Sequence, residues 1–130
     1  MAMEQYDPLD APDPAAWLAL DETTRMQLVE AWHEAAGIEL PNARVHAILH
    51  AVVESQVAEG DAIPVVLKLR QLMAQGMDRH QAIHAIGSVL IRHMFDLAQG
   101  GVIAAGDSDS KRRYFSALKR LNARKWLRSA

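Results

Sequence analysis

Apolar positions recur at helical spacing along most of this chain, and polar capping residues divide the pattern into segments. A first short helix is predicted at Asp13 and Pro14, because Asp is a good cap and Pro suits the first helical position. Further helices are predicted from Asp21 to Gly37, Asn42 to Gly60, Pro64 to Gly76, Asp78 to Gly100, and from Ser110 onward. Residues 1–12 carry two prolines and scattered acids, so we expect a flexible arm with nothing to bury.

Two of the predicted helices carry distinct apolar faces. In the helix after Asn42 the stripe consists of Val45, Ile48, Leu49 and Val52. In the helix after Asp78 the apolar arc consists of Ile83, Gly87, Leu90, Ile91 and Phe95. Such faces predict burial against neighbouring helices.

Length and composition agree with this pattern. The 130 residues are 50% hydrophobic but only 5% aromatic, and they are rich in strong helix formers with few β-branched clusters. We therefore predict an all-α fold: a single-domain bundle of five or six helices at residues 13–130, preceded by the flexible arm at 1–12.

The absence of cysteine restricts the chemistry available to this chain. Disulfides, thiolate metal sites and a cysteine nucleophile are excluded, so any metal site would use histidine and carboxylate ligands. The acidic N-terminus does not resemble a signal or transit peptide, and no apolar run approaches the roughly 20 residues that span a bilayer. We expect a cytoplasmic protein with no membrane partner.

Four of the six histidines form two pairs at helical spacing. His46 and His50 lie four residues apart, with Glu54 four residues further on, and His80 and His84 form the second pair. Residues four apart share a helix face, so two imidazoles at this spacing can bind one metal ion. If the short helix between them reverses the chain direction, the two pairs lie at nearly the same height.

Spacing alone leaves three interpretations of these histidines open. Four imidazoles from two helices can hold a divalent metal, zinc or iron, with Glu54 as a ligand or as a partner of a ligand. Inward-facing histidines can instead be core residues that hydrogen-bond a carbonyl or a carboxylate. The positive ends of both helices, in contrast, favour an anion.

Other motifs give weaker indications. The segment from His80 to His84 carries Gln81 where a zinc peptidase has its glutamate, which disfavours peptidase chemistry. The last predicted helix is basic and carries Tyr114 and Phe115, so it can contact phosphates and bases. However, the net charge of −2 argues against nucleic acid as the main partner.

The histidine segments also carry a resemblance. His46 to His50 followed by Val53 and Glu54, and the run from Arg79 to Gly87, resemble a family of small bacterial helical proteins of unknown function. The resemblance implies an intracellular helical protein and brings no activity or cofactor with it. Ser55 and Gln81 depart from the family pattern, where asparagine and glutamate are common, and neither departure removes a proposed ligand.

Two functions from different classes follow from these patterns. The leading hypothesis is binding of a divalent metal by His46, His50, His80 and His84, with Glu54 beside them. The alternative is an interaction module that binds a protein, a second copy of itself or nucleic acid, with the histidines packing its core. The sequence assigns no substrate and no reaction to either.

Overall fold

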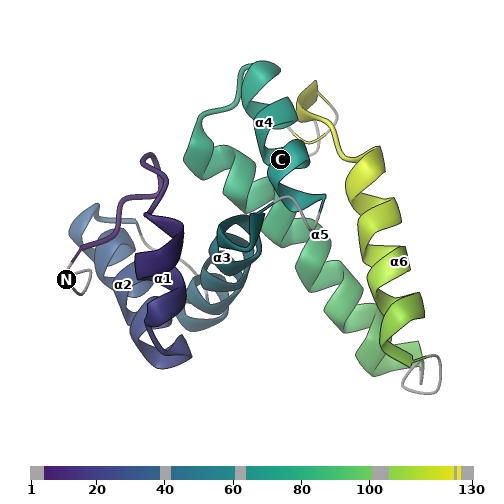
Figure 1. The fold of residues 1–130 in the computed structure, drawn as a ribbon, viewed down its shortest axis with the longest axis horizontal. Coiled ribbons are helices and arrows are strands. Elements are labelled where there is room, and N and C mark those ends of the chain that lie inside the picture. Colours follow the sequence, from purple (N-terminus) through teal and green to yellow (C-terminus); the bar gives the residue numbers. More distant parts are fainter. Residues whose placement is uncertain (1–4, 39–41, 61–63, 101–105, 125, 127–130) are drawn as a thin grey trace. The chain divides into compact units, whose positions relative to one another are not determined.

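The computed structural model describes residues 5–38, 42–60, 64–100, 106–124 and 126, of which the side chains at 96–100 and 106–111 are not described. Six helices are assigned in these ranges, and no strand is found there (Figure 1). They are α1 (Pro14–Ala19), α2 (Glu22–Ala35), α3 (Ala43–Ala58), α4 (Val65–Ala74), α5 (Arg79–Gly100) and α6 (Gly106–Arg120). The predicted all-α fold is confirmed.

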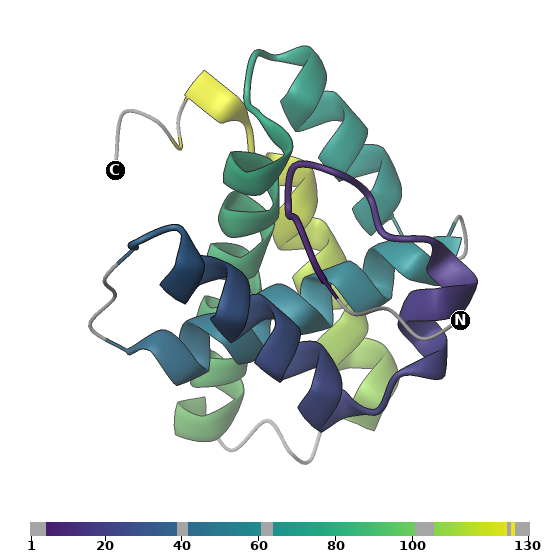
Figure 2. The ribbon, with the colours of Figure 1, turned by 90° about the vertical axis from the view of Figure 1, so that its left-hand side faces the viewer.

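The helices divide into two compact units. The N-terminal unit, Met1–Ile63, holds α1, α2 and α3, and the C-terminal unit, Pro64–Ala130, holds α4, α5 and α6. In the first unit α3 packs against both α1 and α2, and Figure 2 shows α2 and α3 side by side. In the second unit each helix packs against the other two. The sequence shows no break at Pro64 that predicts this division.

Local capping explains where the helices begin. Asp13 accepts a hydrogen bond from the backbone N–H of Ala16, Asp21 from that of Thr24, and Asn42 from that of Val45. These bonds satisfy N–H groups that have no partner within the helix, so the three predicted caps are confirmed. Hydrogen bonds from Thr24, first from its side chain and then from its backbone, lower the pKa of Asp21.

The start of α5 is held by a reciprocal cap. The Asp78 carboxylate accepts from the N–H of Gln81, and the Gln81 side chain accepts from the N–H of Asp78. This arrangement satisfies two backbone donors at once, and glutamine serves it as well as glutamate. Gln81 therefore has a structural task at the position that a peptidase motif would give to a catalytic glutamate.

Trp17 anchors the interior of the N-terminal unit. It is fully buried among Tyr6, Val29, Ala47 and Ala51. Its indole N–H donates to the Ser55 hydroxyl, which in turn donates to the carbonyl of Ala51. The two alanines on α3 leave room for the large indole ring, so small and large residues interlock in this core.

Arg25 fastens the end of α1 to the same core. Its guanidinium donates to the carbonyls of Trp17 and Leu18 and to the Ser55 hydroxyl. The carbonyl of Trp17 also accepts from the backbone N–H of Leu20, so Arg25 adds further donors to the carbonyls at this helix end. Ser55 thus joins all three helices of the unit through one hydroxyl group.

The buried face of α3 differs from the predicted one. Val45, Ile48 and Val52 are exposed by about two-fifths, whereas the buried residues of the helix are Ala47, His50, Ala51, Val53 and Glu54. The predicted apolar stripe is therefore wrong at these three positions. Hydrophobicity alone misplaces the face because His50 and Glu54 have hydrogen-bonding partners inside the unit that make their burial tolerable.

The segment before α1 is also more involved in the core than predicted. Tyr6 is 5% exposed, and Pro8 is fully buried. The Tyr6 ring lies 5.4 Å from the Trp17 ring, measured between centroids. The expectation that this arm has nothing to bury is therefore wrong at Tyr6 and Pro8, because the aromatic ring finds both an apolar neighbour and a partner for its hydroxyl.

The interior of the C-terminal unit is built from aliphatic side chains. Leu72 of α4, Ile83 and Ile86 of α5, and Leu118 of α6 are essentially fully buried. Two residues of the predicted arc, Ile91 and Phe95, are 42% and 62% exposed. The predicted apolar arc of α5 therefore holds for its first half and is wrong for the second.

Two further observations concern the ends and lengths of helices. α6 begins at Gly106, four residues before the predicted start at Ser110. Within the described residues, no helix combines the length and the apolar character needed to cross a membrane.

Candidate metal centre

Three histidines converge in the N-terminal unit. His33 lies in the last turn of α2, while His46 and His50 lie on successive turns of α3. Each offers one ring nitrogen, and these three nitrogens all lie within 4.8 Å of one another. His33 and His50 are buried and His46 is half-buried. The predicted pair on α3 is thus joined by a third imidazole from the neighbouring helix.

The closest approach is between His33 and His46, whose Nε2 atoms lie 3.1 Å apart. A tetrahedral zinc ion with Zn–N bonds of about 2.0–2.1 Å separates two ligand nitrogens by about 3.3 Å. The ring centroids of His33 and His50 are 5.3 Å apart, and those of His46 and His50 are 5.8 Å apart. Small side-chain shifts are therefore enough for the three rings to share one ion.

The backbone fixes how His33 presents its ring. Its Nδ1 lies 2.9 Å from the carbonyl oxygen of Val29, one turn earlier on α2. Because a carbonyl can only accept, Nδ1 carries the proton and the lone pair of the neutral ring lies on Nε2. This is the arrangement in which a metal-binding histidine donates its other N–H to a carbonyl.

Helix ends act on this cluster in opposite directions. His46 lies in the first turn of α3, whose positive end disfavours a cation. His33 lies in the last turn of α2, whose negative end favours one. The argument for an anion that rests on the start of α3 is therefore offset by the end of α2.

Glu54 is held by a tyrosine in the structure. It is fully buried, and its carboxylate accepts a hydrogen bond from the hydroxyl of Tyr6. The same hydroxyl oxygen lies 2.8 Å from Nε2 of His50. Of the two roles predicted for Glu54, partner of a ligand is therefore the one that this geometry favours. Tyr6 connects the carboxylate to the histidine.

The second predicted pair also forms a contact. The rings of His80 and His84, on the first turns of α5, lie 5.2 Å apart between centroids and meet edge to face. Both rings are half-buried. The pair belongs to the C-terminal unit, and its assembly with His46 and His50 into one site stays a prediction.

His33 is the residue that sequence reasoning missed. A search for histidine pairs four residues apart on one helix does not find it, because its partner His46 lies on the next helix. A signal for it exists: α2 ends at Ala35 and α3 begins at Ala43, so the connection is short. Helices joined by short connections pack as antiparallel neighbours, which places the end of one beside the start of the next.

A cleft of about 670 Å³ lies beside this cluster within the N-terminal unit. Its walls include Tyr6 and Trp32, and the Trp32 ring meets the His33 ring edge to face with centroids 5.0 Å apart. Asp7 and Asp10 line the same cleft. Two of its walls are therefore side chains in direct contact with the histidine cluster.

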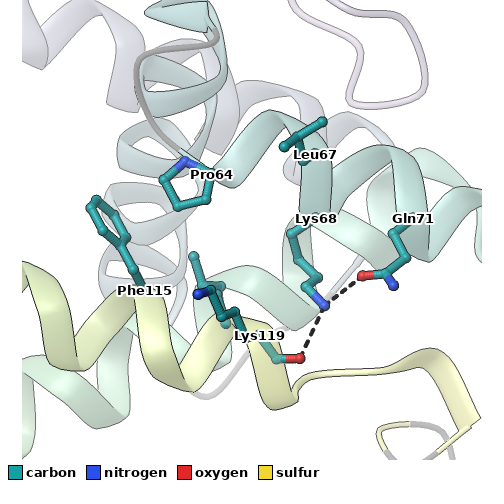
Figure 3. A pocket seen from close by; sticks show the side chains of 7 residues that line it. Pro64, Leu67, Lys68, Gln71, Phe115 and Lys119 are labelled. Carbon is teal, nitrogen blue, oxygen red and sulfur yellow. Dashed lines mark hydrogen bonds between the residues drawn. The ribbon is translucent and has the colours of Figure 1, made fainter.

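A second pocket of about 440 Å³ lies in the C-terminal unit, between α4 and α6 (Figure 3). Lys68 is only 8% exposed, and burial lowers the pKa of its ammonium group. The ammonium donates to the Gln71 side chain and to the carbonyls of Lys119 and Leu121. These carbonyls lie at the end of α6. The Lys68 ammonium therefore provides donors for them and a positive charge at the negative end of the helix.

The exposed face of α6 is basic, as the sequence predicts. Arg112, Arg113, Lys119 and Arg120 are exposed, while Tyr114 and Leu118 are buried. The buried ring of Tyr114 packs beside His93 and Phe115. Tyr114 therefore serves the core and does not offer a stacking surface.

Comparisons with protein-family models, with curated protein sequences and with solved structures give no match to this chain. The resemblance drawn from the histidine segments therefore stays a prediction, and the case for a function rests on the histidine cluster itself.

Proposed function

We propose that this protein binds a divalent metal ion through His33, His46 and His50. The observation that carries the proposal is the 3.1 Å separation of two Nε2 atoms on neighbouring helices, close to the spacing of two ligands on one tetrahedral ion. The hydrogen bond from His33 to Val29 supports it, because it presents the lone pair of His33 to its neighbour.

The donor set favours zinc or iron. Imidazole nitrogens suit zinc, copper, iron and nickel, and hard cations such as magnesium and calcium prefer oxygen ligands. Three neutral imidazoles leave the ion with its full positive charge. A fourth coordination position remains for water or for another side chain. On the basis of the sequence, we propose His80 or His84 as that side chain.

The nature of the fourth ligand decides what the centre does. Four protein ligands make a closed, structural site, whereas a water molecule in the fourth position leaves the ion able to activate that water or bind a substrate oxygen.

The test is the metal content of untagged protein by elemental analysis, for the native sequence and for histidine variants. We expect about one ion per chain, and we expect His33→Ala, His46→Ala and His50→Ala each to reduce it strongly. His93→Ala is the matched control, because this ring contacts Tyr114 and lies outside the cluster. An unchanged metal content in all three variants would overturn the proposal.

Two additional variants address the fourth ligand. His80→Ala and His84→Ala are expected to lower metal content if the α5 pair completes the site, and to leave it unchanged if water does. Protein that binds no zinc or iron even after reconstitution would contradict metal binding. It would favour the interaction module, for which the exposed cations of α6 are the supporting feature.

A further inference from the structure

Tyr6, His50 and Glu54 form one buried hydrogen-bonded chain. The Tyr6 oxygen lies 2.8 Å from Nε2 of His50, and the same hydroxyl donates to Oε2 of Glu54. Their exposed fractions are 5%, 3% and 0%, respectively. Tyr6 comes from the segment before α1, 44 and 48 residues away from its two partners. Because the three groups are shielded from solvent, the hydrogen bonds between them are stronger than they would be at the surface.

The number of protons available to these three groups indicates which ring nitrogen of His50 is protonated. The Tyr6 hydroxyl donates to Glu54, and because a phenol has only one proton, that proton is not available to His50. The contact between Tyr6 and His50 then requires a proton on Nε2 of the histidine, which donates to the phenol oxygen. A neutral ring with its proton on Nε2 has its lone pair on Nδ1.

His33 has the opposite arrangement. Its Nδ1 donates to the carbonyl of Val29, so its lone pair is on Nε2. Nε2 of His46 lies 3.1 Å from that atom, so one proton is shared between these two nitrogens. An ion that displaces this proton binds His33 and His46 through Nε2. The three rings therefore offer different nitrogen atoms to a common centre.

We infer that the metal centre has a mixed ligand set, in which His50 binds through Nδ1 while His33 and His46 bind through Nε2. Tyr6 is the positioning residue that determines this choice, and Glu54 orients Tyr6. The inference rests on the proposed metal centre, and it adds the identity of the binding atoms and the residues that select them. A hydrogen-bonded partner of this kind fixes the ring orientation of a ligand and raises its basicity.

The inference assigns a specific task to the segment before α1. The phenyl ring of Tyr6 packs on Trp17, so Tyr6→Phe retains the packing and removes only the hydroxyl. Without that hydroxyl nothing in the Tyr6 side chain holds the proton on Nε2 of His50. We expect the affinity for zinc to fall by about 10- to 100-fold, as for other partners of metal ligands.

The test is nuclear magnetic resonance of the full chain, labelled with ¹⁵N in its histidines and loaded with ¹¹³Cd²⁺ as the probe. The pattern of ring correlations distinguishes Nδ1 from Nε2, and a ¹¹³Cd–¹⁵N coupling marks each bound nitrogen. We expect couplings to Nδ1 of His50 and to Nε2 of His33 and His46. In Tyr6→Phe we expect the His50 coupling to weaken or move to Nε2, and in the control Tyr114→Phe we expect the native pattern.

The outcomes separate this inference from the proposed function. Coupling to Nε2 of His50 in the native protein, with Nε2 couplings from the other two, would overturn the mixed ligand set and leave the metal centre standing. Absence of coupling to all three histidines would overturn both. The native protein alone decides the binding atoms, so the inference stays testable even if Tyr6→Phe fails to fold.

Discussion

The two units of this protein use buried polar groups in different ways. In the N-terminal unit His33, His50 and Glu54 are buried and lie in one connected group with the Tyr6 hydroxyl. In the C-terminal unit the centre is aliphatic, and the buried ammonium of Lys68 is used by carbonyls at the end of α6. A buried polar group that satisfies the carbonyls at a helix end stabilises the fold. Buried polar groups that meet between two helices form a cluster that can bind a ligand or an ion.

The largest expected effect on stability comes from a cavity in the aliphatic interior of the C-terminal unit. Leu72 is fully buried in the C-terminal unit, so Leu72→Ala removes buried methyl groups and leaves a void. We expect the free energy of unfolding to fall by about 2–5 kcal/mol, as measured by denaturant titration, while the metal content of the folded protein stays unchanged. Loss of metal from the folded variant would contradict the expectation that the metal centre does not depend on the aliphatic interior.

The next prediction concerns metal-linked stability of the N-terminal unit. An ion present at 100 times its dissociation constant adds about 2.7 kcal/mol to the free energy of unfolding. Trp126→Phe leaves Trp17 and Trp32, both in the N-terminal unit, so tryptophan fluorescence then reports on that unit. We expect a chelator to lower the fluorescence transition in this background and to have no effect when His33→Ala is added. An equal response to chelator with and without His33 would contradict the assignment.

The smallest effect is expected at Lys68. Lys68→Met removes the donor for the carbonyls of Lys119 and Leu121 and the Gln71 side chain, which should lower the free energy of unfolding by about 1–3 kcal/mol at neutral pH. Metal content should not change. A variant more stable than the native protein at neutral pH would show that burial of the ammonium outweighs its hydrogen bonds.

The same variant gives a pH dependence with a defined sign. Burial lowers the pKa of Lys68 in the folded protein below the ordinary value of 10.5. Between the folded and unfolded pKa values the unfolded chain binds more protons, so stability rises with pH in that window. We expect the native protein to gain stability relative to Lys68→Met as the pH rises toward 10.5, measured as the difference between paired urea titrations. A decreasing difference would contradict the direction of the shift.

Sequence reasoning succeeded where the determining contacts are local. The caps at Asp13, Asp21 and Asn42 each act on a backbone group three residues away. The pairs on α3 and α5 follow from four-residue spacing, and the structure finds the rings of each pair in contact. Helix class, the starts of α1, α2 and α3, and the candidate pairs could therefore be inferred without a fold, because they depend on residues within about one turn.

Only the tertiary structure decided which groups complete the site. His33 meets His46 across 13 positions, and Tyr6 meets His50 and Glu54 across 44 and 48. The buried face of α3 depends on the same contacts, because His50 and Glu54 can be buried only where partners satisfy them, while Val45, Ile48 and Val52 remain exposed. Burial of a polar side chain is set by partners distant in sequence, and no periodicity along a single helix contains that information.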